Sequence, residues 1–507
     1  MLKKKFVNFR PLFYIFITLA TAIVLSRYIL TSNFVYLGVT VALLFSFVAI
    51  CILKKNFKVL FVIILSFILG FSLYLIEISK FANTENAIDV IITARVSNKI
   101  SENNSYQTII FDDVKTEDGR TLSNVIGYNY NKNNKFLPGE VVKGKVSLRK
   151  FSPFKAYSFS SNAYRNNVYY SFTARKSNFE ILSEDNLHFD ENIQISVKEK
   201  LNKFMTEENS NISYAMLFGD KSEVNDEIRN SFSDSGIAHI LAVSGLHVGV
   251  LVSVLYFILK KCKVNKFVIP AVIFAILLIY CILCSFSPSV VRASIMAIVL
   301  LLSKTFSKEY DSLSSIGLAG IIILLVKPLS IFDIGFQMSF ASVIAIAVFY
   351  KTIFNFLRKI KLPKFIASPL SVSICVQIGL FPLLINCFNK ISILSVFLNL
   401  LIIPIFSFAF IVLLFTLPLL YISSFFGNIL FAVQFILEII KLSAQTVANI
   451  PYTFITLFGL NFAFYFGYYS TLFVSSRFML VSKKSKLIAC LSAILLTVFC
   501  CGFIFAI

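Results

Sequence analysis

Long apolar stretches separated by short charged clusters dominate the pattern of hydrophobic and polar positions. Three apolar spans come first, a long polar region follows, and apolar spans then continue to the end of the chain. The predicted spans are residues 12–30, 34–53, 58–79, 237–259, 267–284, 290–303, 313–326, 333–350, 368–388, 391–421, 427–447, 454–476 and 487–507. Several are short, long or interrupted by proline, so we expect some re-entrant or broken helices. The pattern predicts a polytopic α-helical membrane protein, with three N-terminal transmembrane helices in residues 1–79.

The first part of the polar region, residues 80–185, has the alternation of a β-domain. Alternating positions predict strands at 87–96, 106–114, 124–130, 141–148 and 168–174, continuing toward 179–182. Glu117-Asp118-Gly119 and Leu137-Pro138-Gly139 supply turn signals between them. Five short strands fit a small extracytoplasmic β-barrel of the OB type, although a generic sandwich would give nearly the same periodicity.

Residues 186–236 change to helical periodicity. One apolar stripe contains Ile193, Val197, Leu201, Phe204 and Met205, and a second contains Val224, Ile228 and Phe232. We therefore expect amphipathic helices that lie along the outer membrane surface and lead into a membrane domain of residues 237–507.

Composition supports a membrane protein and charge supplies an orientation. Hydrophobic residues make up 57% of the chain and charged residues only 14%, which excludes an ordinary soluble domain. Basic residues precede the first span and lie between the second and third, so the positive-inside rule places the N-terminus in the cytoplasm and residues 80–237 outside. The net charge of +21 does not by itself indicate a nucleic-acid partner, because cytoplasmic loops of membrane proteins carry such an excess.

The segment 239–249 opens the fourth span with unusual polar content. It holds two of the chain's three histidines, His239 and His247, together with Ser244 and Gly245. Imidazoles need partners, serine competes for backbone hydrogen bonds and glycine loosens a helix. Such content is tolerated where protein or a water-filled cavity covers the backbone. We interpret the segment as a polar break inside a membrane bundle that lines a path.

Other interpretations of this segment stay open. The histidines can be interfacial residues at a helix end, and Ser244-Gly245 can be a helix-packing notch. Ser244 and His247 could also serve as nucleophile and base of an intramembrane hydrolase, although no Asp is placed to orient His247. A metal site is disfavoured because no Asp, Glu or Cys lies between the histidines, and we expect no metal-ligand cluster outside the membrane either.

A few charged residues lie within the later spans. Arg292 and Asp333 would each cost about 3 kcal/mol at a bilayer centre, so we expect them to pair, to face water or to lie at an interface. Glu438 and Lys441 are three residues apart and are expected to neutralise each other.

Ordered motifs around the segment resemble a known family. The sequence HILAVSGLHVGVL is similar to the signature of the ComEC-type competence proteins, membrane channels that admit single-stranded DNA during transformation. Further motifs agree in order: 215–220, 287–293, Asp311, Pro328, 333–340, Gln377 with Pro382, and Asn399 with Pro404. The similarity covers most of the chain from about Ala87 to about Pro404. Several ordered motifs are far more specific than any one alone.

The resemblance implies a channel for uptake of single-stranded DNA across the cytoplasmic membrane, and an OB-like fold for the polar domain. Its pore motif would comprise His239, Ser244, Gly245, His247, Arg292, Asp333 and Gln337. An intramembrane hydrolase, or a transporter of another anionic polymer, is the alternative. Expected partners are single-stranded DNA, the lipid bilayer, a membrane-anchored DNA receptor, a cytosolic DNA translocase and a separate nuclease; an oligomer is compatible with the sequence.

Two absences shape that list of partners. No nucleotide-binding motif is visible, so transport needs a separate motor or another gradient. Many family members continue into a metallo-β-lactamase-like domain, whereas this chain ends in an apolar segment, so we expect the chain to lack that domain, to need no cofactor or metal, and not to be an enzyme.

Basic and aromatic residues interleave in the second half of the predicted barrel. The cations, uninterrupted by any acidic residue, are Lys143, Lys145, Arg149, Lys150, Lys155, Arg165, Arg175 and Lys176. Tyr157 and Tyr164 are among the aromatics between them. Cations bind phosphates and ring faces stack on unpaired bases, as a single strand requires. A solvated strand edge over core aromatics would give the same pattern, and the resemblance favours a DNA-binding face.

Overall fold

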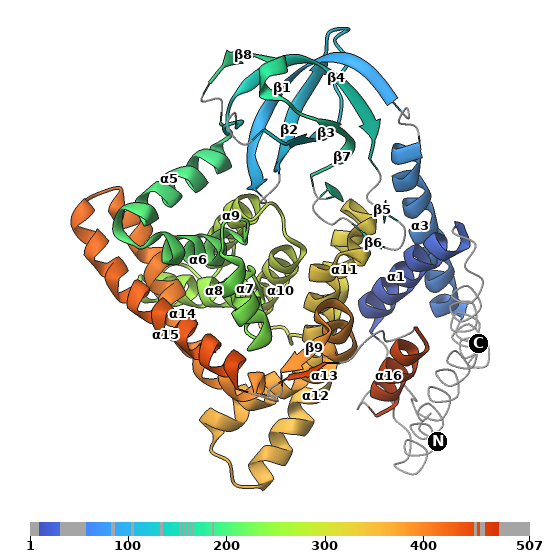
Figure 1. The fold of residues 1–507 in the computed structure, drawn as a ribbon. Coiled ribbons are helices and arrows are strands. Elements are labelled where there is room, and N and C mark those ends of the chain that lie inside the picture. The colour runs from blue at the N-terminus through green and yellow to red at the C-terminus, as the bar shows by residue number, and fades with distance from the viewer. Residues whose placement is uncertain are drawn as a thin grey trace.

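A computed structural model describes most of the chain. The described residues are 10–30, 57–82, 87–102, 106–131, 135–151, 154–155, 158–159, 163–164, 166–184, 187–392, 394–450, 454–456 and 462–475. The predicted spans 34–53 and 487–507 lie outside these residues. A β-barrel occupies one end of the molecule, and a bundle of helices extends away from it (Figure 1).

The polar domain is a closed five-stranded barrel, which confirms the predicted OB-like fold. Its strands are β1 (Ala87–Glu102), β2 (Gln107–Thr116), β3 (Asn124–Asn129), β4 (Val141–Lys150) and β7 (Val168–Thr173), with β8 (Phe179–Ser183) added to β4. The sheet order is β1-β2-β3-β7-β4-β8, and antiparallel pairing of β1 with β4 closes the barrel. β3 and β7 run parallel. The short strands β5 (Phe154–Lys155) and β6 (Ser158–Phe159) pair separately.

Alternation along the strands builds the barrel core. In β4, Val142, Val146 and Leu148 are buried, whereas Lys143, Lys145 and Ser147 face outward. The ring of Phe111 is fully buried against these side chains. Gly127 allows this ring to approach, because a Cβ atom there would lie 2.5 Å from it.

Helices α5 (Phe189–Phe204), α6 (Glu207–Phe218) and α7 (Asp226–Asp234) connect the barrel to the bundle. The two predicted apolar stripes are present, with Leu201 of α5 and Phe232 of α7 buried. Between them lies α6, which the periodicity did not reveal. Asn209, Ser210 and Ser213 of α6 are fully buried, because the helix is packed against α5 and against α14 and α15 of the membrane domain.

The membrane domain is a helical bundle. Its helices are α1 (Pro11–Leu30), α3 (Phe57–Ala82), α8 (Gly245–Lys261), α9 (Val268–Leu283), α10 (Pro288–Thr305), α11 (Ser312–Val326), α12 (Ile334–Lys359), α13 (Lys364–Phe388), α14 (Ser395–Leu420), α15 (Ile429–Asn449) and α16 (Phe462–Ser475). Six helices of the described residues are long and apolar enough to cross a membrane. The chain is therefore a multi-pass membrane protein.

Three predicted spans have different boundaries because their first residues lie outside the helix. The span 237–259 is interrupted as expected: the 3₁₀ helix η2 (Ala238–Leu241) and an extended linker precede α8. The spans 391–421 and 454–476 begin instead with β9 (Lys390–Ser392) and β10 (Phe454–Thr456), which pair antiparallel. β-branched residues suit this short ladder better than a helix start.

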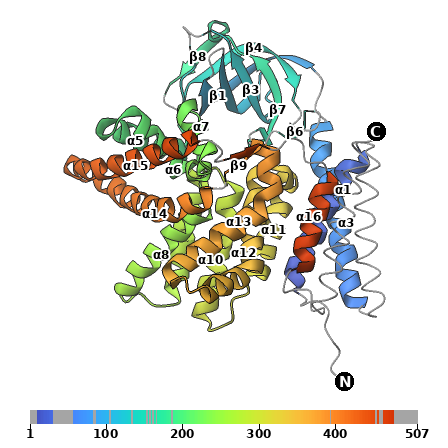
Figure 2. The ribbon, with the colours of Figure 1, turned by 60° about the horizontal axis from the view of Figure 1, so that its bottom comes forward.

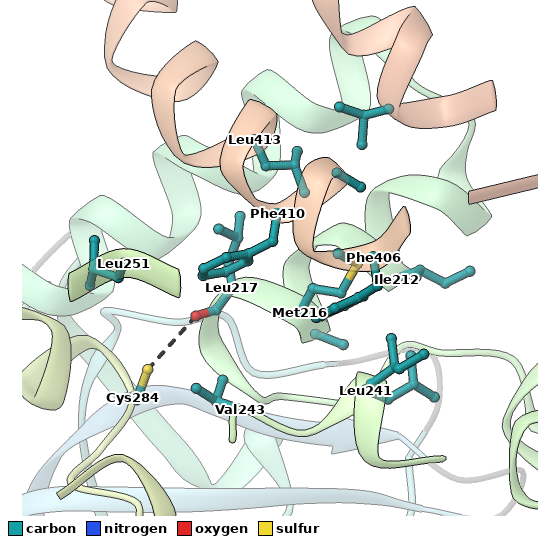
Figure 3. Packing of buried hydrophobic residues seen from close by; sticks show 14 of the residues in the cluster. Ile212, Met216, Leu217, Leu241, Val243, Leu251, Cys284, Phe406, Phe410 and Leu413 are labelled. Atoms are coloured by element: carbon teal, nitrogen blue, oxygen red, sulfur yellow. Dashed lines mark hydrogen bonds between the residues drawn. The ribbon is translucent and has the colours of Figure 1, made fainter. Parts of the chain in front are cut away.

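The largest hydrophobic cluster joins the outer helices to the bundle. Figure 3 shows Met216 and Leu217 of α6 packed close to Phe406 and Phe410 of α14. On the neighbouring helix α15, Lys441 lies 2.8 Å from Glu438, which confirms the predicted neutralising pair. Lys441 also lies 3.1 Å from Glu208 of α6.

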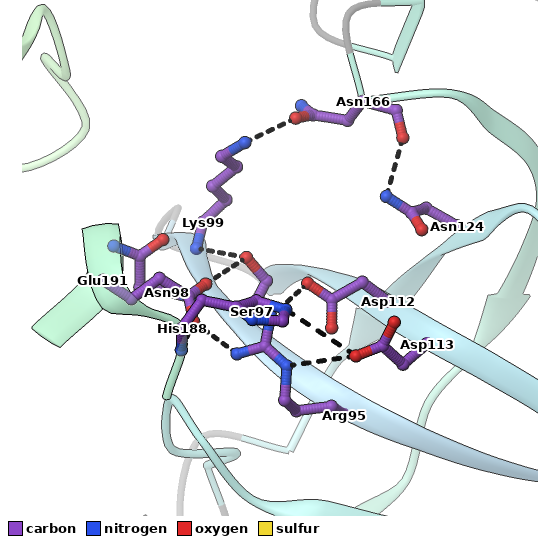
Figure 4. A network of polar contacts seen from close by, with 10 residues as sticks. All are labelled: Arg95, Ser97, Asn98, Lys99, Asp112, Asp113, Asn124, Asn166, His188 and Glu191. Carbon is purple, nitrogen blue, oxygen red and sulfur yellow. Dashed lines mark hydrogen bonds and ion pairs between the residues drawn. The ribbon is translucent and has the colours of Figure 1, made fainter. Parts of the chain in front are cut away.

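Polar contacts dock the barrel onto the bundle. A bulge in β1 after Val96 turns Ser97 and Asn98 toward α5, where Ser97 Oγ and the Asn98 N–H both donate to Glu191 (Figure 4). Buried Arg95 donates to the same carboxylate. Gln194 of α5 in turn donates 2.7 Å to the Leu283 carbonyl at the end of α9. The barrel is thereby held at the end of the bundle where α10 begins.

Candidate functional site

The N-terminal ends of α8, α10 and α12 meet below the barrel. Ser244 and Asp333 cap α8 and α12 through their side-chain oxygens, and α10 begins with proline after Ser287. Ser289 Oγ of α10 donates 3.5 Å to the Gly335 carbonyl of α12. The 3₁₀ helix η3 (Pro328–Phe332) precedes α12 and contacts the barrel. Figure 2 shows the barrel at one end of the bundle, with α8 extending away from it.

His247 closes a capping box at the start of α8. Its Nδ1 atom accepts the Ser244 N–H at 3.1 Å and lies 3.0 Å from Ser244 Oγ, which itself accepts the Leu246 N–H. The His247 residue is 1% exposed. Its ring makes edge-on contacts with the rings of Phe406 and Phe410, with centroid separations of 5.0 and 4.8 Å. Because Nδ1 accepts a backbone N–H, a neutral ring carries its proton on Nε2. The pair has the geometry of a helix cap buried in aromatic packing.

This geometry differs from a serine–histidine catalytic pair. In such a pair, a third group accepts the proton on the second ring nitrogen and orients the base. Among the described residues, Nε2 of His247 has no hydrogen-bond partner. Ser244 Oγ is meanwhile engaged by the backbone of its own helix.

Arg292 lies beside this cap, one turn into α10. It is 4% exposed, and its guanidinium donates from Nη1 to the Ser339 carbonyl of α12. Its Nε atom has no hydrogen-bond partner within the described part of the chain. A Cβ atom at Gly245 would lie 2.8 Å from Nη2 of Arg292, so the guanidinium packs directly against this glycine. Burying an arginine at membrane depth costs about 3 kcal/mol on insertion scales, so a buried arginine here indicates a specific role.

The other predicted pore residues occupy separate environments. His239 is exposed on η2, outside α8. Asp333 is buried, and its Oδ1 accepts the Gly335 N–H at 2.7 Å as the α12 cap. Gln337 donates 2.9 Å to the Ile331 carbonyl and so ties α12 to η3. The structure thus brings Ser244, Gly245, His247 and Arg292 into one group, and a pore-lining role stays a prediction.

A row of cations lies on the outer face of β4. Lys143, Lys145 and Arg149 alternate with buried residues, and Lys145 and Arg149 are exposed. Lys143 is half-exposed, with its Nζ 3.6 Å from a carboxylate oxygen of Glu117. Lys150 follows directly and is half-buried. This part of the predicted DNA-binding face is therefore accessible.

Two residues of the predicted face are not available to DNA. Tyr164 is 3% exposed, and its hydroxyl accepts the Leu329 N–H of η3 at 3.2 Å, so it joins the barrel to the bundle and cannot stack on a base. Lys176 lies 2.5 Å from Glu140 and donates to the Lys135 carbonyl, which neutralises and fixes its ammonium group. Tyr157, Arg165 and the Lys155 side chain lie outside the described residues.

An aromatic group that the sequence analysis missed lies on β2 and β3. The ring of Tyr106 is 5.8 Å from that of Tyr128 and 5.5 Å from that of Tyr130, which is 59% exposed. The Tyr128 carbonyl accepts the Ala174 N–H, so exposed Arg175 follows directly on the neighbouring strand. Nucleic acids bind this face of OB folds, at the second and third strands. The available signal was the i, i+2 spacing of Tyr128 and Tyr130 at the end of β3.

An acidic group lies where the barrel meets α5. A bulge opposite Ala94, with Asp113 at a φ of 50°, turns Asp112 and Asp113 toward Arg95. Burial, partly offset by Arg95, raises the pKa of Asp112 to about 6. Burial would also raise the pKa of Glu191, but hydrogen bonds from Arg95, Asn98 and His188 hold it below its ordinary value.

This group corrects the expectation that metal ligands would not gather outside the membrane. Ligand atoms of Asp112, Asp113 and His188 lie within 4.8 Å of one another, because the bulge brings distant residues together. The Arg95 guanidinium, however, lies 2.5 Å from Asp112 and 3.9 Å from Asp113. A bound cation would compete with this guanidinium, so the arrangement fits an ion-paired docking contact better than a metal site.

Comparison with known proteins places these features in context. Residues 216–481 match the family described as Competence protein. The chain is 28% identical over 263 residues to ComE operon protein 3 of Bacillus subtilis (strain 168), an alignment covering 50% of this chain and 32% of that protein. It is 24% identical over 207 residues to Recombination protein 2 of Haemophilus influenzae, covering 38% of this chain and 26% of that protein.

A third relative is shorter. An uncharacterized protein of Mycoplasma pneumoniae, the MG316 homolog, is 28% identical over 192 residues, covering 37% of this chain and 47% of that protein. The chain thus matches less than half the length of each of these relatives. No solved structure matches the chain.

Proposed function

The chain belongs to the competence protein family, and from that premise we propose that it forms a channel through which single-stranded DNA crosses the cytoplasmic membrane during natural transformation. One observation carries the proposal: the barrel presents exposed cations and tyrosines, and it is docked over the end of the bundle where three helices begin. Cations bind phosphates and tyrosines stack on bases without sequence preference, which suits a strand in transit.

Charge distribution supports the proposed orientation, with the barrel outside and the N-terminus in the cytoplasm. Helices α8, α10 and α12 begin below the barrel and end in basic residues, Lys260 and Lys261, Lys304, and Arg358 and Lys359 respectively. Basic residues are retained on the cytoplasmic side of membrane proteins. DNA bound by the barrel would then enter from the outside.

We propose a transport role without catalysis. The His247 ring is fixed by the α8 cap, and no third group orients its Nε2 atom within the described residues. A strand moving through the bundle requires an external receptor to deliver it, and a cytosolic translocase or another gradient to pull it. A separate nuclease would supply the single strand from duplex DNA.

Uptake in living cells tests the proposal. Cells with and without the gene receive labelled donor DNA, and the label that becomes resistant to external nuclease is measured. A channel predicts internal single strands only when the protein is present, while DNA bound outside remains in its absence. Equal internal label in both cell types contradicts the proposal.

A pair of tyrosine variants adds a matched comparison. Tyr130→Ala removes a ring from the barrel surface, whereas Tyr421→Ala removes an equally exposed ring (56%) at the end of α14. Stacking contributes about 1–3 kcal/mol per base, so the affinity for oligothymidylate should fall at least about fivefold only for Tyr130→Ala. Equal effects of both substitutions on affinity would contradict DNA binding at this surface of the barrel.

A further inference from the structure

Arg292 is a buried cation without a carboxylate partner. The guanidinium makes one hydrogen bond, to the neutral Ser339 carbonyl, and the Phe340 ring centroid lies 5.9 Å from it. Within the described residues it forms no ion pair, and its Nε atom is without a partner. A buried charge is ordinarily paired, because removal from water penalises an isolated ion heavily.

The start of α8 lies beside Arg292. Gly245 is the first residue of α8, a helix of 17 residues, and Arg292 Nη2 lies against it. On its other side, the guanidinium reaches Ser339 in the second turn of α12. Helix N-termini carry partial positive charge. The guanidinium and the start of α8 therefore lie side by side, whereas the start of α12 is capped by the Asp333 carboxylate.

We propose that the missing counter-charge is the cargo: Arg292 binds backbone phosphates of single-stranded DNA as they pass the start of α8 within the bundle. This inference rests on the proposed channel function and assigns its phosphate-binding residue. Gly245 keeps the space beside the guanidinium open, and the Ser244–His247 cap fixes the helix start that faces it. Contact with phosphate and not with bases suits a channel that accepts any sequence.

The test combines a protein change with a change in the DNA backbone. Arg292→Met removes the charge and keeps an unbranched stem, Arg292→Lys keeps the charge, and Arg229→Met is the control at an exposed arginine paired with Asp226 on α7. Each variant is offered strands with ordinary phosphodiesters or with a central tract of uncharged methylphosphonates. Nuclease-resistant uptake is measured in cells with equal amounts of membrane-inserted protein.

Contact with phosphate predicts non-additive losses. In the unaltered protein and in Arg229→Met, the neutral tract should lower uptake at least tenfold. In Arg292→Met, both strands should enter equally slowly. Arg292→Lys should restore the preference for the charged strand. If the losses of uptake from Arg292→Met and from the neutral tract were additive, the inference would be overturned. A lipid phosphate bound to Arg292 would give this result, because its effect would not depend on the charge of the strand. Absence of uptake by the unaltered protein would instead overturn the channel.

A crosslink keeps the inference testable if Arg292→Met fails to insert. The Ala293 Cβ lies 3.7 Å from a Cβ placed at Gly245, so Ala293→Cys adds a thiol beside the guanidinium. A strand stalled by terminal streptavidin and carrying bromoacetamide on one phosphorothioate should react with this thiol. Val326→Cys, on an exposed position of α11, should not react. Equal or absent labelling at both positions would contradict passage of phosphates past Arg292.

Discussion

The cation row on β4 gives a prediction whose size follows from the structure. Lys143, Lys145 and Arg149 share the outer face of one strand, and six residues at about 3.4 Å each place the outer two about 20 Å apart. A single strand laid along β4 could contact all three side chains. Replacing the three with Gln removes these phosphate contacts and leaves the buried face of the strand unchanged.

The triple substitution should remove two to three phosphate contacts and so reduce the salt dependence of binding. Each phosphate contact to a single strand contributes about −0.7 to the slope of log affinity against log salt, so three contribute about −2. Lys143 contributes less, because Glu117 lies 3.6 Å from its ammonium group. With a slope of about −2, affinity falls about 16-fold between 50 and 200 mM salt. The triple variant should lose most of this fall.

The assay is fluorescence anisotropy of labelled oligothymidylate with the full-length protein in nanodiscs, over a series of salt concentrations. The matched control replaces Lys260, Lys261 and Lys263, three exposed lysines at the far end of α8, with Gln. Both variants lose the same net charge, so a general electrostatic effect would change both slopes equally. An unchanged slope for the β4 variant, or equal changes in both, would refute the binding face.

Three further predictions test the cap, the acidic group and the orientation. Ser244→Ala should destabilise the protein by about 1 kcal/mol through loss of the α8 cap and retain substantial DNA uptake; near-complete loss at normal protein levels would favour the hydrolase. Because folding raises the pKa of Asp112 from 3.8 to about 6, its ionisation weakens the folded state as the pH rises through that range. Asp112→Asn should therefore gain up to about 3 kcal/mol of unfolding free energy relative to the unaltered protein between pH 4 and 6, and a pH-independent difference in denaturation would contradict this. Asp118→Cys should react with an impermeant maleimide in intact cells that lack an outer-membrane barrier, and native exposed Cys262 only after permeabilisation; the reverse pattern would invert the topology.

Elements with a strong local pattern could be predicted without the fold. The alternation in β4 places Val142, Val146 and Leu148 inside the barrel, as observed. The apolar stripe of α5 likewise buries Val197 and Leu201. When only one face of a helix or strand is buried, its apolar residues recur at a regular spacing, and this spacing is visible in the sequence. Helix α6 gave no comparable signal, since its polar residues are buried as fully as its apolar ones.

The candidate site divides in the same way. The polar break before α8 is visible in the sequence because serine, glycine and histidine are unusual in an apolar span. Its assembly with Arg292, which lies 47 residues from Ser339, depends on packing between helices. Tyr164 shows the converse: it resembles a stacking residue in sequence, and only the position of η3 reveals that it is a buried contact.

By itself, the sequence determined the membrane class, the barrel strands, most helices and the interrupted span, because backbone hydrogen bonding and one-sided burial impose local periodicity. The tertiary structure alone decided which charges are satisfied. Lys176 and Arg95 meet carboxylates, whereas Arg292 meets a carbonyl and the start of α8. Electrostatic partners act through space and not along the chain, so no local pattern records them.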